Sequence, residues 1–148
     1  MLPRLRTTSE ENEGGFTLIE LLVVMIIIGI LAAIAIPVFL SQRAKAQDTA
    51  AKADVSTLGK EIAAYYVDNT GTATITIVSG RYVLTPTAGT AVDLGKASAN
   101  VTVPGGTTAN LAGDTAWCVG VQNLKGAKDN WKYSSSAGLS QGICSGTT

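Results

Sequence analysis

The apolar residues of the chain are concentrated in one long stretch near its N-terminus. From Leu21 to Leu40 there is no charged residue, and only Gly29 and Pro37 interrupt the apolar run. A helix of this length spans roughly 30 Å at ~1.5 Å per residue, which matches the hydrocarbon core of a membrane. Because backbone groups in lipid must pair within their own segment, we expect a membrane-spanning helix here.

The helical pattern continues past Leu40, but one face becomes polar. Residues 41–68 contain no proline, and their apolar positions recur at spacings near three and four, which predicts an amphipathic helix. Asp68-Asn69-Thr70-Gly71 is a typical stop signal, so we predict one helix over about residues 17–68. Gly59 is expected to be tolerated there at a cost of about 1 kcal/mol.

The two faces of this second helical half have different compositions. The expected apolar stripe consists of Ala44, Ala51, Val55, Leu58, Ile62 and Tyr65. The charged residues expected on the other faces are Arg43, Asp48, Lys52, Asp54 and Lys60. Among these, Asp48 and Lys52 have the favourable i,i+4 order for an ion pair. The apolar stripe therefore needs a partner elsewhere in the chain.

Residues 72–148 contain short alternating segments typical of strands. Thr74–Val78 and Arg81–Leu84 flank Ser79-Gly80, which predicts a hairpin with a tight turn. The segment Thr85–Asn100 is expected to be a loop. Further strands are expected at Asn100–Val103, Thr115–Val121 and Asn130–Ser134. An antiparallel sheet with one face on the helix stripe follows, and the fold class is α+β.

Two cysteines, Cys118 and Cys144, lie in this small Gly- and Thr-rich region. In an exported protein such a pair indicates one disulfide, whereas in a cytosolic protein it indicates two free thiols. The membrane-length segment favours export. A bond would close a loop of about 27 residues and contribute about 3.5 kcal/mol in the chain-entropy account, which would help a core that is otherwise marginal.

Charge and composition exclude several classes of function. The 11 basic and 11 acidic side chains balance, so there is no electrostatic argument for nucleic acid. The chain has no histidine, no C-x-x-C pair and no P-loop, which argues against a catalytic triad, a histidine metal site and a phosphate cradle. We expect neither an enzyme nor a bound cofactor or metal.

A nucleic-acid interface has only weak support in the head. Basic side chains beside aromatic ones can capture single strands. The residues that would form such a patch are Arg81, Lys96, Lys125, Lys128 and Lys132, with Trp131 and Tyr133. Ordinary surface charge is the simpler interpretation, and we prefer it.

The order Gly15-Phe16-Thr17-Leu18-Ile19-Glu20, followed by the long apolar run, resembles the N-terminus of type IV prepilins. That family includes type IV pilins, competence pilins and type II secretion pseudopilins. The motif covers residues 14 to about 40, and the following 28 residues resemble the family in architecture alone. The resemblance implies cleavage after Gly15 by a prepilin peptidase and N-methylation of Phe16. The acidic residues Glu10, Glu11 and Glu13 depart from the usually basic leaders of the family.

The resemblance divides the chain into four parts. Residues 1–15 are the expected leader, 16–40 the membrane and polymerisation helix, 41–71 the amphipathic helix, and 72–148 the β-sheet head with one disulfide. A type IV pilin-like fold is therefore expected. In many pilins a C-terminal disulfide bounds a variable surface loop, and residues 125–142 are the matching candidate for an exposed face here.

Glu20 is the unusual residue of the motif, because a charge inside a bilayer is costly. Its carboxylate could simply reach the membrane interface. Alternatively, cleavage after Gly15 creates an amine on Phe16, and a neighbouring subunit's Glu20 pairs with it to fix axial register. The resemblance implies this assembly role for Glu20. It also favours a deliberate weak point in the helix between Gly29 and Pro37 over two ordinary membrane-helix residues.

The function expected from these features is that of a structural subunit. After processing it would polymerise through its apolar helix into an extracellular type IV pilus fibre that serves adhesion, motility or DNA uptake. The implied partners are other copies of the chain, a prepilin peptidase, an assembly ATPase with its membrane platform, and membrane lipid before assembly. A pseudopilin of a secretion or competence apparatus is the alternative within the family.

Alternatives outside the family remain open from the residues alone. Ala33-Ile34-Ala35 has the form of a signal-peptidase site, and cleavage there would release a soluble domain that begins at Ile36. A single-span anchored binding module is a further alternative. Arginines precede the span, but Arg43, Lys45 and Lys52 follow it, so charge does not support either orientation. A cytoplasmic N-terminus in the inner-membrane precursor follows from the resemblance alone.

Overall fold

The computed structural model describes residues 15–104, 110–111 and 115–144. The expected leader, up to Gly14, therefore lies outside the described residues. The chain divides into two compact units, Met1–Val38 and Phe39–Thr148, with the boundary inside the helix α1.

Helix α1 spans Leu18–Asp68, which confirms the predicted single long helix. Its C-terminal end has the features of the predicted stop signal. The side-chain amide of Asn69 donates to the carbonyl of Tyr65 at 2.9 Å, and Gly71 adopts a φ of 94° that favours glycine. The Tyr66 hydroxyl donates to the Gly71 carbonyl at 3.1 Å and fixes the chain as it leaves the helix.

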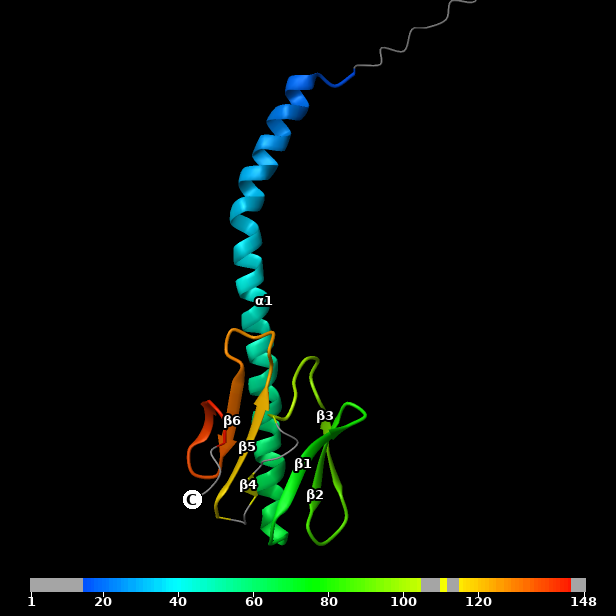
Figure 1. The fold of residues 1–148 in the computed structure, drawn as a ribbon, viewed down its shortest axis with the longest axis vertical. Helices are drawn as coiled ribbons and strands as arrows, with labels where there is room; N and C mark the ends of the chain where they lie inside the picture. Colours follow the sequence, from blue (N-terminus) through cyan, green and yellow to red (C-terminus); the bar gives the residue numbers. More distant parts are fainter. Residues whose placement is uncertain (1–14, 105–109, 112–114, 145–148) are drawn as a thin grey trace, which may run out of the picture. The chain divides into compact units, whose positions relative to one another are not determined.

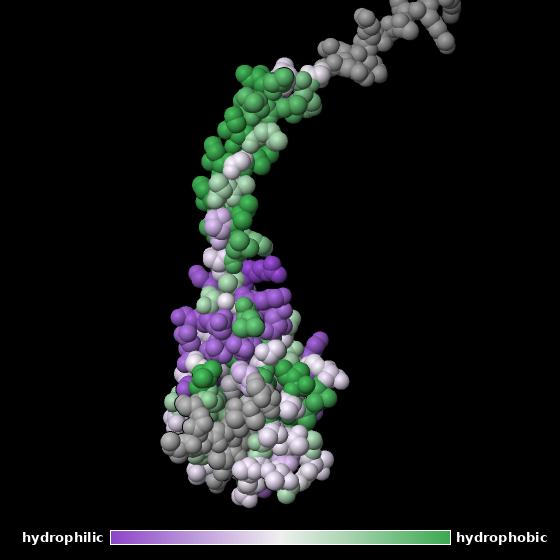
Figure 2. All heavy atoms as spheres, in the orientation of Figure 1, coloured by the Kyte–Doolittle hydropathy of each residue, from purple (hydrophilic) through white to green (hydrophobic). Residues whose placement is uncertain are grey.

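The first unit contributes a helix whose side chains are exposed all round. From Leu18 to Val38 all the large apolar residues of α1 are solvent-exposed. This part is long and apolar enough to cross a membrane, and Figure 2 shows hydrophobic side chains along it. Because no other described residue covers this surface, we expect lipid or other molecules to bury it.

In the second unit the described strands form one antiparallel sheet beside the second half of α1 (Figure 1). The strand order is β3-β2-β1-β4-β5-β6-β7. The strand bounds are Ala73–Val78 (β1), Arg81–Pro86 (β2), Val92–Lys96 (β3), Asn110–Leu111 (β4), Trp117–Gln122 (β5), Asn130–Ser134 (β6) and Gly138–Gln141 (β7). The predicted α+β class and antiparallel sheet are confirmed.

The β1–β2 hairpin forms as predicted around Ser79-Gly80. Val78 pairs with Arg81, which leaves these two residues as the turn. Their φ values are 50° and 74°. Positive φ at both central positions matches the right-handed twist of the flanking strands.

Two predictions for the remaining strands were wrong, and one strand was missed. The expected loop Thr85–Asn100 contains β3, which pairs with β2 around a bulge that leaves Leu94 without an opposite residue. The expected strand Asn100–Val103 forms only an isolated bridge between Thr102 and Gln122, because Asn100 has a φ of 65° that breaks the extended course. β7 lies inside the candidate exposed face, residues 125–142, where no strand was predicted after Asn130–Ser134.

The core lies between the helix stripe and one face of the sheet. Helix residues Ala51, Val55, Leu58 and Ile62 are buried as predicted, whereas Tyr66 replaces Tyr65 as the fully buried tyrosine. Ala44 and Tyr65 are only half-buried. The strands contribute Ala73, Ile75, Tyr82, Leu84, Leu94, Trp117, Val119 and Val121.

Two acids predicted on the outer faces of α1 are instead buried. Asp48 and Asp54 are 6% and 9% exposed. Each carboxylate accepts hydrogen bonds from the head, so it is satisfied without a basic partner on the helix. Lys52, the expected i,i+4 partner of Asp48, places its ammonium 4.3 Å from the ring centroid of Trp131. The sequence pattern thus predicted solvent-exposed carboxylates, whereas Asp48 and Asp54 are buried and bind loops of the head.

Candidate functional site

The junction before α1 is exposed and non-helical. Gly15, Phe16 and Thr17 precede the first helical residue, Leu18. Phe16 is 79% exposed, and no atom of the described residues lies close to the position that a Cβ on Gly15 would occupy. An accessible, non-helical backbone with a side-chain-free residue suits the groove of a protease. The structure therefore leaves the predicted cleavage position open to an enzyme.

Thr17 and Glu20 form a reciprocal cap at the start of α1. The backbone N–H of Glu20 donates to Thr17 Oγ1 at 3.2 Å. Glu20 Oε2 in turn accepts from the backbone N–H and the hydroxyl of Thr17, both at 3.4 Å. This is a capping box, in which two backbone donors of the first turn are satisfied by side chains. The role of Thr17 was missed, although the T-x-x-E spacing before an apolar run is its sequence signature.

The cap changes the interpretation of Glu20. Its carboxylate is an N3 residue of the helix, where the dipole favours an anion. Its partners are neutral and its contacts are long, so the charge itself is not neutralised within the described residues. The site therefore offers an exposed carboxylate in a fixed position beside the chain end that cleavage after Gly15 would create.

Gly29 and Pro37 lie within the continuous helix. Pro37 is inside α1 and leaves the helix assignment unbroken. No atom lies near the position that a Cβ on Gly29 would occupy. Pro37 has no N–H to donate to the Ala33 carbonyl, so one helical hydrogen bond is missing there. The weak point between Gly29 and Pro37 stays a prediction.

Asp54 holds the β3 end of the head against α1. Its carboxylate accepts from the Tyr82 hydroxyl at 2.8 Å, from the Ser98 N–H at 2.8 Å and from the Ser98 hydroxyl at 2.7 Å. Burial raises the pKa of the Tyr82 hydroxyl, and the hydrogen bond to Asp54 raises it further. This arrangement joins the helix, β2 and the segment after β3.

A second polar anchor holds the loop after β5 to α1. Asn123, which is fully buried, donates from its amide to the Gln47 carbonyl at 3.2 Å and to Gln47 Oε1 at 2.9 Å. The Lys128 N–H donates to Asp48 Oδ1 at 3.0 Å. A Cβ on Gly126 would overlap Asp48 Oδ1. Together these contacts fix residues 123–128 on the helix.

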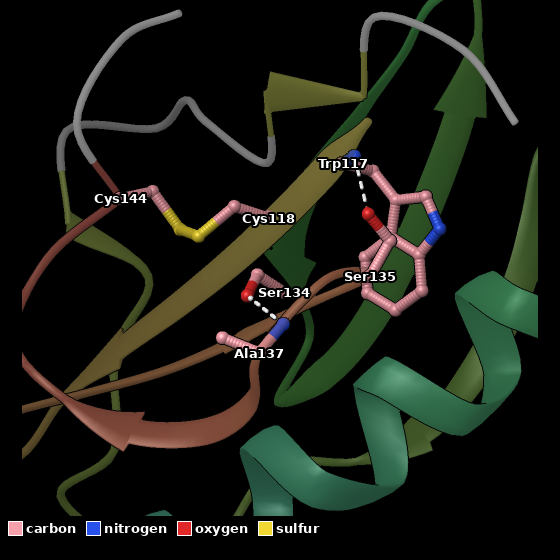
Figure 3. Close-up of a disulfide and its surroundings, with 6 residues drawn as sticks. All are labelled: Trp117, Cys118, Ser134, Ser135, Ala137 and Cys144. Carbon is pink, nitrogen blue, oxygen red and sulfur yellow. Dashed lines mark hydrogen bonds between the residues drawn. A yellow bond between two sulfur atoms is a disulfide. The ribbon is translucent and has the colours of Figure 1, made fainter. Parts of the chain in front are cut away.

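The predicted disulfide between Cys118 and Cys144 is present (Figure 3). It joins β5 to the segment that follows β7, with the two Cα atoms 5.8 Å apart. Nearby, the Trp117 N–H donates to the Ser135 hydroxyl at 3.3 Å and the Ala137 N–H donates to the Ser134 hydroxyl at 3.2 Å. The bond thus ties the segment after β7 to β5.

The residues of the weakly supported nucleic-acid patch are not brought together. Arg81 and Lys96 face each other on β2 and β3, whereas Lys132 is on β6, with β1, β4 and β5 between them in the sheet. Arg81 is paired with Asp93 at 2.5 Å, and this hydrogen bond holds the pKa of Asp93 below its usual range. Trp131 and Tyr133 are half-buried against the core; the Lys52 ammonium lies over the Trp131 ring, and Trp117 stacks on Tyr133.

Chemistry of other kinds is also missing from the described residues. No group of histidine, cysteine and acidic side chains there could hold a metal ion. Both cysteines are in the disulfide. The distinctive feature of the described chain is therefore the capped, exposed apolar helix.

Comparison with known proteins finds similarity in the same N-terminal part of the chain. Residues 12–36 match the family described as the prokaryotic N-terminal methylation motif. The chain is 42% identical over 58 residues to the type II secretion system core protein G of Pseudomonas aeruginosa, covering 39% of this chain and 41% of that protein. It is 48% identical over 58 residues to the type IV wide pilus major component PilA4 of Thermus thermophilus, covering 39% and 44%. The N-terminal part of the chain is therefore similar to that of type IV pilins and type II secretion pseudopilins.

The match of this pilin-like chain to its relatives is partial. With core protein G of Dickeya chrysanthemi it shares 33% identity over 78 residues, which is 53% of this chain and 51% of that protein. The chain thus spans about half the length, or less, of these curated relatives. No solved structure matches. The relatives carry names of pilus and secretion components.

Proposed function

We propose that this pilin-like subunit polymerises through the first half of α1 into an extracellular type IV pilus fibre. The observation that carries the proposal is the apolar surface from Leu18 to Leu40, which is exposed on all sides of the helix. Such a surface is stable only in lipid or against similar surfaces. Membrane lipid covers it in the precursor, and other copies cover it in the fibre.

Processing prepares the subunit for assembly. A prepilin peptidase cuts after Gly15, and the new N-terminal Phe16 is N-methylated. The exposure of Phe16 and the open space around Gly15 support access by both activities. Before the cut the chain is a single-pass protein of the inner membrane with its N-terminus in the cytoplasm.

Glu20 sets the register between subunits. Its carboxylate makes only long contacts to the neutral donors of Thr17. A cationic Phe16 amine of a neighbouring copy is a stronger donor, because charge-assisted hydrogen bonds are roughly twice as strong as neutral ones. Burying that pair among apolar helices leaves one favourable axial offset between copies, since other offsets bury an unpaired charge.

Assembly requires machinery that the chain does not encode. An ATPase and a membrane platform extract the subunit from lipid, and the segment between Gly29 and Pro37 unwinds in the fibre. The missing hydrogen bond at Pro37 lowers the cost of that change. DNA uptake, adhesion and motility are all compatible with such a fibre.

A pseudopilin of a type II secretion apparatus is the second candidate. Two of the relatives described above are named core protein G of that system. The exposed apolar helix supports both roles equally, because both require polymerisation. The difference between them is the length and location of the fibre.

Two measurements test the proposal. N-terminal sequencing of the mature protein should give Phe16, whereas Ile36 would mean signal-peptidase cleavage and a soluble product. Electron microscopy of material sheared from the cell surface should show long fibres that disappear when the gene is deleted. Loss of protein secretion without surface fibres would identify a pseudopilin, and crosslinking that yields only monomers would indicate an anchored binding module.

A further inference from the structure

The head presents positive charge at the end where α1 enters it. The apolar run ends at Leu40, and Arg43 and Lys45 follow within five residues. Basic residues on the far side of a span oppose the usual charge bias of membrane proteins. Their presence at the membrane boundary therefore calls for a use that compensates for it. This inference rests on the membrane-anchored precursor of the proposed function.

An open recess of about 420 Å³ lies at this end of the head. It is lined by Leu40, Arg43 and Ala44 of α1 and by Lys125 of the loop after β5. The recess thus combines apolar walls with two cations from parts of the chain that are far apart in sequence. Figure 2 shows hydrophilic side chains gathered at this end of the head.

The loop that supplies Lys125 is held rigidly. Besides the amide bonds of Asn123 to Gln47, the Lys125 N–H donates to Asn123 Oδ1 at 3.1 Å, and the Asn123 N–H donates to the Asp129 carbonyl at 2.8 Å. Despite this support, Leu124 is 72% exposed. The fold therefore holds an aliphatic side chain in solvent next to a lysine.

The charges near the recess are predominantly positive. Lys125 and Lys128 are exposed on the loop, and Arg43 and Lys45 are exposed on α1. The opposing acids are Asp129, which is exposed on the same loop, and Asp48, whose buried carboxylate is held by the Lys128 N–H. An anionic group with an apolar neighbour would complement this combination.

We propose that the recess binds the phosphate headgroup of an anionic phospholipid in the leaflet where Leu40 leaves the membrane. Arg43 and Lys125 bind the phosphate, and Leu124 enters the boundary between headgroups and acyl chains. Basic residues beside a span attract anionic lipid in this way, and aliphatic side chains add to the attraction. The contact holds the head against the membrane until the subunit is extracted.

The test measures which lipid associates with the full chain in reconstituted bilayers. Spin-labelled phosphatidylglycerol and phosphatidylcholine report the relative association of the two lipids with the protein. Lys125→Gln should lower the preference for phosphatidylglycerol by about fivefold, the effect expected for one lysine at an anionic surface. Lys96→Gln, an exposed lysine on β3, is the matched control and should leave the preference unchanged.

The result that overturns the inference is equal lipid preference in wild type and Lys125→Gln. Such a result would mean that anionic lipid is attracted only by Arg43 and Lys45 beside the span, without a contribution from Lys125 of the loop after β5. Unchanged unfolding temperatures would show that both variants fold. Extraction of the wild-type chain from membranes by alkaline carbonate would instead contradict the membrane-anchored precursor itself, so the two failures are distinguishable.

Discussion

Gly59 lies on the face of α1 that packs against the sheet, and Tyr133 of β6 occupies the space in front of it. A Cβ at Gly59 would lie 2.5 Å from Tyr133 Cγ, closer than real side chains approach. The expectation that Gly59 is merely tolerated was therefore incomplete. We expect Gly59→Ala to lower the free energy of unfolding by about 1–3 kcal/mol through overpacking, measured by urea denaturation of the full chain in detergent.

A double-mutant cycle with Tyr133 provides the control for this prediction. Tyr133→Ala removes the ring that the new methyl group would meet, so Gly59→Ala should cost much less in that background. The interaction free energy of the cycle isolates the clash. Additive effects of the two substitutions would show that the packing against Tyr133 is not the cause.

The buried Tyr82 hydroxyl makes the head sensitive to alkali. Burial and the hydrogen bond to Asp54 raise its pKa in the folded state, whereas the unfolded tyrosine titrates near its ordinary value of about 10. The stabilising contribution is therefore complete below about pH 10 and is lost as the pH rises above it, by up to ~1.4 kcal/mol per pH unit. Urea unfolding between pH 8 and pH 11 measures this dependence.

Tyr82→Phe is the matched variant for the alkaline effect. It should be less stable at neutral pH, because Asp54 loses one of its hydrogen-bond donors. Its stability should then fall less steeply with pH than that of the wild type. Parallel curves for the two proteins would rule out Tyr82 as the titrating group.

At the scale of elements, the disulfide holds the end of the sheet. Replacing both Cys118 and Cys144 by serine should lower the free energy of unfolding by about 3.5 kcal/mol, since the bond closes a loop with a sequence separation of 26 residues. Reductant should destabilise the wild type by the same amount and leave the double variant unchanged. A reductant effect on the double variant would contradict this assignment.

The elements with strong periodicity could be predicted, and the weakly patterned ones could not. Helix α1 and the β1–β2 hairpin follow from apolar spacing and from Ser79-Gly80. β3 was hidden by Gly95, which marks a bulge rather than a loop. β7 has one large apolar residue, Leu139, and takes its conformation from pairing with β6. Strand pairing of this kind is a tertiary effect that local propensity does not encode.

The candidate site could be predicted in part, for a similar reason. Glu20 and the junction at Gly15 were proposed from their order in the sequence, and their roles in assembly and cleavage stay predictions. Thr17 was missed because its hydroxyl acts through the backbone of Glu20 rather than by its own chemistry. Asp48 and Asp54 were assigned to solvent, because burial of a charge depends on donors from distant loops that no spacing rule reveals.

At the scale of the whole molecule, capping and assembly can be separated by substitution. Glu20→Gln keeps an oxygen that can accept from Thr17 but removes the charge. We expect it to lower the yield of sheared fibres about tenfold or more, because a buried amine without its partner costs several kcal/mol. Thr17→Val removes the hydroxyl but keeps the carboxylate, and it should still form fibres.

The opposite outcome would assign a different role to Glu20. Normal fibres from Glu20→Gln, with few fibres from Thr17→Val, would show that the capping box matters for helix formation and that no charge pairing sets the register. Immunoblots for total subunit should accompany both counts, so that unstable protein is not mistaken for failed assembly.

The capping box also bears on what maturation does to the subunit. All of its donors and acceptors lie in Thr17 and Glu20, and the Thr17 N–H belongs to the peptide bond with Phe16. A cut between Gly15 and Phe16 therefore removes no bond of the cap. Under the proposed processing, the mature subunit keeps the helix start of the precursor and gains a cationic amine on Phe16. The proposed maturation would thus add a charge without breaking a contact of the cap.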